Sequence, residues 1–428
     1  MEQFKSALKA FIRESCEMLA AEPREQRTWV RIVREGGGRT SFPAETRDDF
    51  WATLFRFQMR NPANKMASFK PLVKDVQKKP QLRDTLLVDA GGEPIAPESA
   101  QESWLENRFV SLLYGYVSRA NGFQFYDRIF NELFDAFQKD VFSPDITVTE
   151  LSPLMNFEME SDQIQISDNL WLRQLSTDEL EGWLNSERLL TVQPLSTHEL
   201  LQLESAVEIM YQQERNSKSG SFEARKKVSL LLTAICLLTD GSPRLAFTKR
   251  STSSFLTPGL GTSWGPLVHR LGRSAKVDKS QESDLVELYR KLWSSPNETK
   301  IRVALERWNS AADRATEEDK LIDYWIALES LFVPDSTEEL SYRTALRIAA
   351  FLGSDGVERT QIYKQMKDSY RLRSEIVHGS IRKRKKNVGP TELIKLSRSY
   401  LRQALLRILE SGRPFDPSKL ETQLLEKE

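Results

Sequence analysis

A succession of helical patterns between residues 280 and 409 constrains the fold more than any other feature of the sequence. Apolar residues recur there at three- and four-residue spacing in six stretches, and each predicts a helix. Short proline, glycine and asparagine breaks separate these stretches, which favours a compact helical bundle. The tail from Ser411 is polar and interrupted by proline, so we expect its end to be disordered. The six stretches are residues 284–293, 300–314, 319–332, 341–352, 360–378 and 390–409.

The first 140 residues are also predicted to be mainly helical. Residues 4–19 and 104–142 carry the helical spacing, and the second stretch is rich in aromatic residues. Two loops are expected between them, one at the glycines of 36–38 with a turn at Pro43, the other at residues 89–94. No role is assigned to this N-terminal region.

The pattern changes near residue 141, where short alternating segments predict strands among helices. Ser176 and Glu179 have the spacing of a capping box and predict the start of a helix. The fold class is therefore multidomain α+β, divided into residues 1–140, 141–279 and 280–428. The predicted strands are 146–149, 163–166, 245–248 and 253–256, and the predicted helices, besides the one starting at Ser176, are 206–211 and 222–238.

Composition excludes several classes of protein. Lys plus Arg and Asp plus Glu are both 61, so any nucleic-acid site must be a local patch. Cys16 and Cys236 form no ligand cluster, which argues against a zinc site and fits a reducing compartment. Charged residues recur among the apolar ones of residues 1–21, so we expect no secretory signal, and no apolar run reaches membrane-spanning length. Nucleotide-binding loops, the Gly-x-Ser-x-Gly pattern and the dinucleotide fingerprint are absent. We expect a soluble, cytoplasmic protein with no metal, cofactor or membrane partner.

Residues 370–379 combine arginines and a histidine in one helical stretch that ends in glycine. An imidazole can transfer a proton to or from a ribose hydroxyl, and a guanidinium can bind a phosphate. Arg371 lies two turns before His378 on the same face, whereas Arg373 lies about 140° round the helix and needs its long side chain or a partner subunit to complete a site. Ser374, four residues before the histidine, could orient the imidazole.

A purely structural alternative accounts for the same residues. Gly379 has the position of a helix-capping glycine, and a histidine at a helix C-terminus is favourable without any chemistry. His198 and His269, the other two histidines, have no catalytic pattern around them and are interpreted as structural. Both interpretations of His378 stay open from the residues alone.

Five consecutive positive charges follow the histidine, and residues 371–386 carry a net charge of +6 in a neutral protein. Such a segment can bind the phosphate backbone of RNA, or can be a solvated loop between two helices. The five residues are Arg382, Lys383, Arg384, Lys385 and Lys386.

Glu329 is the charged residue of an otherwise apolar helical segment, residues 324–332. Its carboxylate is either exposed or buried against a cation, and Arg343 and Arg347 are the nearest cations in the sequence. A buried pair of this kind would hold geometry near a site more than it adds stability.

Together these blocks resemble the HEPN ribonuclease superfamily, specifically its Apea-like branch of bacterial defence proteins. The middle region, at residues 153–154 and 172–179, is similar to the α+β segment that commonly precedes this domain. The first 140 residues carry no such resemblance. The matching blocks are Arg307-Trp308-Asn309 with residues 318–332, then residues 339–349, then residues 371–379.

The resemblance implies specific roles and partners. It places Arg373 and His378 on the catalytic Arg-x4-His pair of the family, with Ser374 at the polar position that follows the arginine. Family members usually form homodimers with one composite, metal-independent site that cuts RNA to a 2′,3′-cyclic phosphate and a 5′-hydroxyl. Ser380 occupies the position of the tyrosine that some HEPN toxins use for silencing by AMP, so that control is not expected.

From this we predict an endoribonuclease that acts on tRNA or single-stranded RNA, with a toxin-like role in antiphage defence (abortive infection). Arg371, Glu329, Arg343 and Arg347 are possible supporting residues. A trigger or an antitoxin partner would control the enzyme. Two other classes remain: a non-catalytic HEPN scaffold that binds RNA or a partner protein, and a helical accessory subunit of a nucleotidyltransferase.

Overall fold

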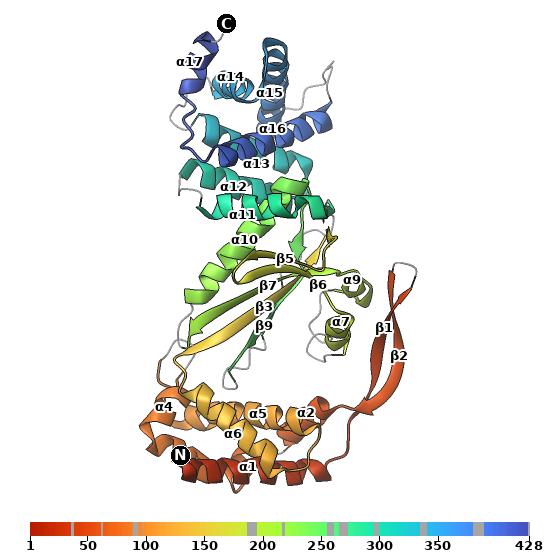
Figure 1. The fold of residues 1–428 in the computed structure, drawn as a ribbon, viewed down its shortest axis with the longest axis vertical. Helices are drawn as coiled ribbons and strands as arrows, with labels where there is room; N and C mark the ends of the chain where they lie inside the picture. The colour runs from red at the N-terminus through yellow and green to blue at the C-terminus, as the bar shows by residue number, and fades with distance from the viewer. Residues whose placement is uncertain are drawn as a thin grey trace. The chain divides into compact units, whose positions relative to one another are not determined.

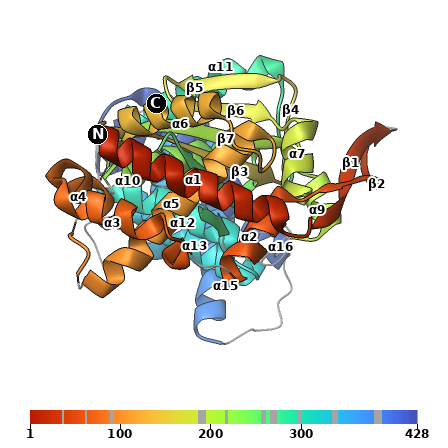
Figure 2. The ribbon, with the colours of Figure 1, turned by 90° about the horizontal axis from the view of Figure 1, so that it is seen from below.

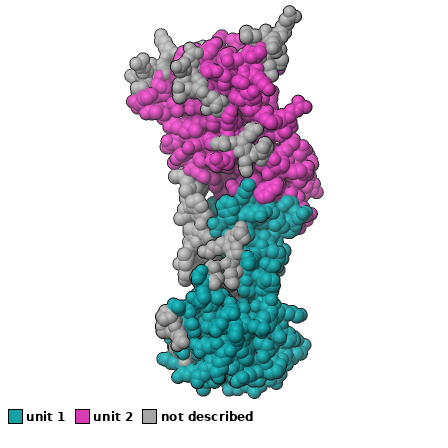
Figure 3. Space-filling view, turned by 90° about the vertical axis from the view of Figure 1, so that its left-hand side faces the viewer, with its two compact units in different colours: residues 1–155, 167–228, 245–265 teal, residues 156–166, 229–244, 266–428 magenta. Residues whose placement is uncertain are grey.

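The chain is mixed α+β, and its C-terminal region is helical, as the sequence predicts. The computed structural model divides it into two compact units (Figure 3). Unit 1 comprises residues 1–155, 167–228 and 245–265, and unit 2 comprises 156–166, 229–244 and 266–428. Each unit is thus built from separate stretches of sequence, and the three-part division by sequence stays a prediction. The structure describes residues 1–35, 38–60, 63–88, 93–96, 98–185, 195–215, 219–254, 261–264, 273–294, 299–333, 340–379 and 389–426.

Unit 1 begins with a group of helices whose core is largely aromatic. Figure 1 and Figure 2 show α1 running alongside α5 and α6, and the rings of Phe4 and Phe137 stack there at 5.7 Å between centroids. Buried phenylalanines fill this core, because the inward faces of α1, α3, α5 and α6 each carry at least one of them. The helices are α1 (Glu2–Ala21), α2 (Phe50–Arg60), the short 3-10 helix η1 (Ala63–Lys65), α3 (Phe69–Lys78), α4 (Pro80–Leu86), α5 (Glu98–Ala120) and α6 (Asp127–Val141).

A β-hairpin interrupts these helices, and the turn predicted at Pro43 is wrong. Of the loop predicted at residues 36–38, residues 36 and 37 lie outside the described residues and Gly38 begins the second strand. β1 (Gln26–Glu35) pairs antiparallel with β2 (Gly38–Asp48), and Pro43 lies inside β2 opposite Val30, next to a register shift. The β-branched residues before the glycines, Thr28, Val30, Ile32 and Val33, were the missed signal. The outer edge of β1 is hydrogen-bonded by side chains: Asn185 accepts from the Val30 amide at 2.8 Å and Glu181 from the Ile32 amide at 2.7 Å. Those contacts protect a strand edge that would otherwise be open.

The rest of unit 1 contains an antiparallel sheet in the order β10-β9-β3-β7-β6. The helix predicted at 206–211 is wrong, because those residues belong to β7, where every second side chain is buried. Apolar residues at 206, 207, 210 and 211 imitate helical spacing, so the local pattern misled. The capping box of Ser176 is confirmed at the start of α7. The elements are β3 (Asp145–Met155), β6 (Leu170–Gln174), α7 (Thr177–Leu184), α9 (Thr197–Leu201), β7 (Ser205–Glu214), α10 (Ser219–Thr239), β9 (Phe247–Thr252) and β10 (Gly261–Trp264).

The predicted strands at 146–149, 163–166 and, in part, 245–248 are confirmed by β3, β5 (Gln163–Ser167), β8 (Arg244–Leu245) and β9. The strand predicted at 253–256 is wrong for residues 253 and 254, since β9 ends at Thr252, and its remainder lies outside the described residues. The predicted helix 222–238 is confirmed by α10. The chain passes between the two units after residues 155, 166, 228, 244 and 265, and three of these crossings fall within β5, α10 and β8.

Unit 2 contains the six predicted helices of the C-terminal bundle, all confirmed. A small parallel pair of β4 (Phe157–Met159) and β11 (Ala275–Val277) precedes them, followed by the 3-10 helix η2 (Lys279–Gln281). The expectation of a disordered tail is wrong for residues 419–426, which form α17. The helices are α11 (Glu282–Ser294), α12 (Thr299–Asp313), α13 (Glu317–Phe332), α14 (Leu340–Leu352), α15 (Gly356–Val377), α16 (Pro390–Ser411) and α17 (Lys419–Glu426).

A buried chain of hydrogen bonds ties α13, α15 and α16 together. The indole of Trp325 donates to the hydroxyl of Ser369 at 2.9 Å, and that hydroxyl lies 2.5 Å from the hydroxyl of Ser397. Ser397 in turn donates to the carbonyl of Leu393 at 2.8 Å. All three side chains are fully buried, so each polar group needs its partner. This chain fixes the rotation of α15 about its axis. None of the described helices is both long and apolar enough to cross a membrane.

Candidate functional site

The candidate site lies on α15 and on the part of α13 packed against it. Asp355 caps the start of α15 by accepting from the amide of Glu358 at 2.9 Å. The buried residues of α15 recur at three- and four-residue spacing, and they determine which face of the helix packs against the bundle. They are Ile362, Met366, Ser369 and Leu372. The Arg/His motif occupies the last two turns, so the packing of these residues decides where its side chains lie.

Arg373 lies against the bundle rather than in solvent. Its guanidinium is 3.9 Å from the carboxylate of Glu329 on α13, and the two side chains are only 23% and 20% exposed. The guanidinium also lies 5.8 Å from the centroid of the Tyr370 ring, within the range of a cation–π contact. Within the described part of the chain its Nε has no hydrogen-bond partner. Arg373 is therefore held by one loose ion pair and one ring, with hydrogen-bond donors left over.

The environment of Glu329 is unfavourable for its charge. Burial raises the pKa of this carboxyl, and the positive charge of Arg373 offsets only part of that rise. Perturbed carboxyl groups beside an arginine are typical of functional sites, although structural pairs show the same effect.

Arg343 and Arg347 do not pair with Glu329, so that interpretation of the sequence is wrong. Both contact Glu421 of α17, at 3.4 Å and 2.8 Å. Arg347 is buried and also donates to the carbonyl of Phe332 at 2.6 Å. The sequence could not reveal this pairing, because Glu421 is more than seventy residues away in a tail expected to be disordered. The two arginines fasten α17 to α14.

His378 is the C-cap residue of α15 and is exposed. Its amide donates to the carbonyl of Ser374 at 3.0 Å, and Gly379 follows with φ +63°, the left-handed conformation in which glycine commonly ends a helix. The local backbone is thus the one the capping alternative predicts. It also leaves the imidazole open to an incoming molecule, so capping and chemistry are compatible.

The remaining residues of the motif lie around this end of the helix. Ser374 is half-buried, and Arg371 is exposed and paired with Asp368 at 3.1 Å. Tyr370, which packs edge-on against Trp325 at 5.1 Å, was missed by sequence reasoning. Its position three residues before Arg373 was the available signal, because residues at that spacing share a helix face.

Several predicted residues cannot be placed. His269 and the whole basic segment Arg382, Lys383, Arg384, Lys385 and Lys386 lie outside the described residues. The described chain ends at Gly379 and resumes at Gly389, just before α16. His198 is exposed on α9, where its Nε2 lies 2.9 Å from the side-chain amide nitrogen of Gln202.

Comparisons with known proteins give no family to which the chain can be assigned. No family model matches the sequence, and neither the curated proteins nor the solved structures gave a significant match. Function must therefore be argued from the residues and their geometry.

Proposed function

We propose that the protein is a metal-independent endoribonuclease in which His378 transfers the proton and Arg373 stabilises the phosphate. The exposed His378 at the end of α15 is the single observation that carries this proposal, since it presents an imidazole to solvent five residues beyond a half-buried arginine. As the 2′-hydroxyl loses its proton to a general base, its oxygen attacks the adjacent phosphorus, the P–O5′ bond breaks and the departing 5′-oxygen takes up a proton, which leaves a 2′,3′-cyclic phosphate and a 5′-hydroxyl.

Arg373 supports the proposal through its surroundings. Glu329 and Tyr370 hold its guanidinium in a half-buried position. The Nε–H is buried, so a phosphate oxygen would bind the N–H groups at the other end of the guanidinium. Arg373 and His378 are five residues apart and point about 140° away from each other around α15. We therefore propose that two copies of the chain combine, each giving residues to a shared site.

The test is RNA cleavage in EDTA by the full chain, with tRNA and a single-stranded RNA as substrates. We expect wild type to cleave and to leave cyclic phosphate ends, and His378→Ala and Arg373→Gln to be inactive. His198→Ala is the matched control, because that histidine is also exposed but lies on α9 of unit 1. Cleavage by His378→Ala at the wild-type rate would refute the assignment.

Mixing the two inactive variants tests the shared site. If Arg373 and His378 act from different subunits, a mixture of His378→Ala and Arg373→Gln chains restores part of the activity, whereas each variant alone stays inactive. No recovery, in a mixture shown to exchange subunits, would place the complete site within one chain.

We propose further that the protein acts in antiphage defence and that the basic segment, residues 382–386, binds RNA. RNA contacts by residues 382–386 would make cleavage strongly dependent on salt, because each neutralised phosphate steepens the logarithmic salt slope by about 0.7–0.9. Replacing all five with glutamine should flatten that slope. A slope equal to wild type would assign the segment to a solvated loop.

A further inference from the structure

A small polar pocket lies in unit 2, among residues that the ribonuclease proposal does not use. Its volume is about 70 Å³. Its lining includes Trp308 and Tyr324, which are almost completely buried, and the buried Cys236. Five of its lining residues are cationic: Arg244, Arg273, Arg314, Lys320 and Arg398.

These cations approach the pocket from different elements of the fold. Arg244 comes from β8, Lys320 from the first turns of α13, and Arg398 from α16. Arg273 precedes β11, and Arg314 lies between α12 and α13. Positive charge on several sides suits a tetrahedral anion, whose oxygens point in different directions, better than a planar carboxylate.

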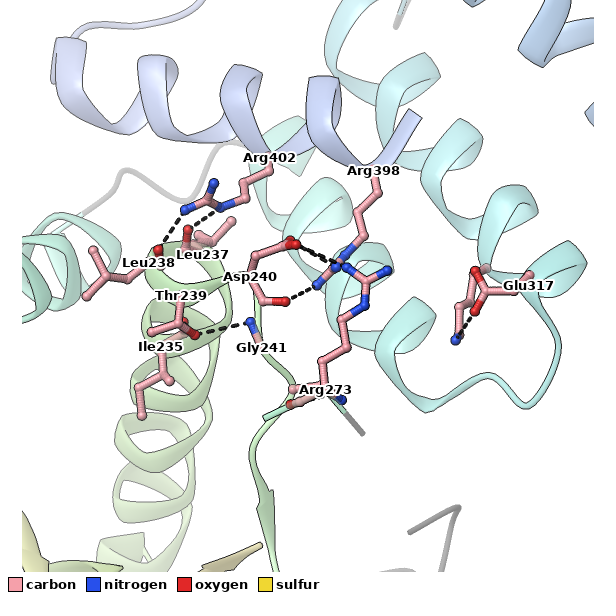
Figure 4. Close-up of polar contacts among 12 residues, drawn as sticks. Ile235, Leu237, Leu238, Thr239, Asp240, Gly241, Arg273, Glu317, Arg398 and Arg402 are labelled. Carbon is pink, nitrogen blue, oxygen red and sulfur yellow. Dashed lines mark hydrogen bonds and ion pairs between the residues drawn. The ribbon is translucent and has the colours of Figure 1, made fainter. Parts of the chain in front are cut away.

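Acidic residues in the network neutralise only part of this charge. Asp240 pairs with Arg273 at 3.0 Å and with Arg398 at 2.9 Å, one guanidinium on each carboxylate oxygen (Figure 4). Asp323 is shared by Arg314 and by Arg307, which does not line the pocket. The remaining pairs are Arg244 with Asp313 and Lys320 with Glu317. The five cations that line the pocket are thus paired with four carboxylates, one of which is also shared with Arg307, so positive charge remains in excess.

The two nearest neutral groups add no negative charge at physiological pH. Burial raises the pKa of Tyr324 to about 12 and that of the Cys236 thiol to about 11, although nearby arginines act in the opposite direction. Both groups therefore stay protonated, and the excess positive charge of the pocket persists.

Backbone contacts hold the charged groups in place before any ligand arrives. The amide of Arg273 donates to the hydroxyl of Ser242 at 2.9 Å, and the amide of Ser242 donates to the carbonyl of Arg273 at 3.0 Å. Arg398 donates to the carbonyl of Asp240 at 2.7 Å, and the neighbouring Arg402 donates to the carbonyl of Leu238 at 2.6 Å, at the end of α10 (Figure 4). Each guanidinium has five N–H donors, so Arg273 and Arg398 keep donors for a ligand.

We propose that this pocket binds one phosphate group of a small ligand, with Arg273 and Arg398 as its main contacts. A cavity volume of roughly 10–15 Å³ holds one water, so a volume of about 70 Å³ admits a phosphate but not a nucleoside. Trp308 and Tyr324 are almost completely buried, and the guanidinium of Arg398 lies over the Trp308 ring, so a base would find little ring surface to stack on. The phosphate is either the free ion or the terminal group of a molecule that extends into solvent.

The test is calorimetric titration of the full chain with inorganic phosphate and, separately, with 5′-AMP, at constant ionic strength. We expect saturable binding of at least one of them at one site per chain, weakened tenfold or more by Arg273→Gln. Arg302→Gln is the matched control, because Arg302 is an exposed arginine of α12 that pairs with Glu306 outside the pocket. Tighter binding of AMP would identify a phosphate monoester as the source, and equal or weaker binding the free ion.

Two outcomes would overturn the proposal: neither probe binds wild type, or Arg273→Gln and Arg302→Gln weaken binding equally, as expected for nonspecific attraction. Arg314→Gln is a second pocket variant for the case in which Arg273→Gln does not fold, since its side chain is about half exposed. A melting temperature without ligand equal to wild type establishes that the variant tested is folded.

Discussion

The carboxylate of Glu329 on α13 lies 3.9 Å from the guanidinium of Arg373 on α15, and both side chains are largely removed from solvent. This pair joins the helix that carries the proposed catalytic histidine to the centre of the bundle. Because the pair is buried but loose, its main effect should be on the position of Arg373 rather than on stability.

Replacing Glu329 by Gln should therefore separate activity from folding. The side chain keeps its size but loses the charge that holds Arg373, so we expect RNA cleavage to fall by about tenfold to a hundredfold. The free energy of unfolding at neutral pH should be unchanged or slightly higher. A cleavage rate equal to wild type would show that Glu329 has no positioning role.

The pH dependence of stability should also reveal Glu329. Burial raises the pKa of this carboxyl in the folded chain, so the folded state binds its proton more tightly than the unfolded state. Ionisation then costs folding free energy as the pH rises above the unfolded pKa of about 4.3, and the full cost is reached above the folded pKa. Wild type should lose stability relative to Glu329→Gln across that window, as measured by urea denaturation. A difference that stays constant with pH would contradict this expectation.

Ser369→Ala should destabilise the bundle by about 1–3 kcal/mol, because it leaves the indole N–H of Trp325 buried without a partner. Denaturant unfolding measures this change. Ser399→Ala is the control: Ser399 is an exposed serine of α16, and its loss should change the free energy of unfolding by less than about 0.5 kcal/mol. Equal effects of the two variants would argue against the three-helix hydrogen-bond chain.

Arg347→Met should release α17. The substitution removes the contact with Glu421 and leaves the carbonyl of Phe332 without its donor, at a cost of about 2–4 kcal/mol. Hydrogen exchange should show faster exchange of the amides in residues 419–426. Glu421→Gln, at a position more than a third exposed, should cost about 1 kcal/mol or less. Unchanged exchange in Arg347→Met would mean that other contacts hold α17.

Two glycine substitutions should change stability in opposite directions. A Cβ at Gly241 would lie 2.4 Å from the Cβ of Ala275, so Gly241→Ala must displace backbone and should cost about 1–3 kcal/mol. Gly182, within α7, has open space around a Cβ, and Gly182→Ala should stabilise by about 0.5–1 kcal/mol. Thermal unfolding distinguishes them. Stabilisation by Gly241→Ala would disprove the close approach of the two segments.

Much of the fold could be predicted because its signals are local. The six helices predicted for residues 280–409 are recognisable from apolar spacing within a dozen residues, and Ser176 with Glu179 specifies the cap of α7. The wrong predictions also came from local patterns. Residues 206–211 satisfy the spacing of a helix, yet they become a central strand because β3 and β6 provide hydrogen-bond partners on both sides.

The sequence by itself determined the helices of the bundle, the helix end at Gly379 and the concentration of positive charge after it. Only the tertiary structure decided which charges meet: Arg373 with Glu329, Arg347 with Glu421, and Arg273 and Arg398 on Asp240. The physical reason is the distance along the chain over which each interaction acts. Helical propensity and capping act between residues three or four apart, whereas an ion pair or a pocket requires groups far apart in the chain to be brought within a few ångströms by the packing of the core.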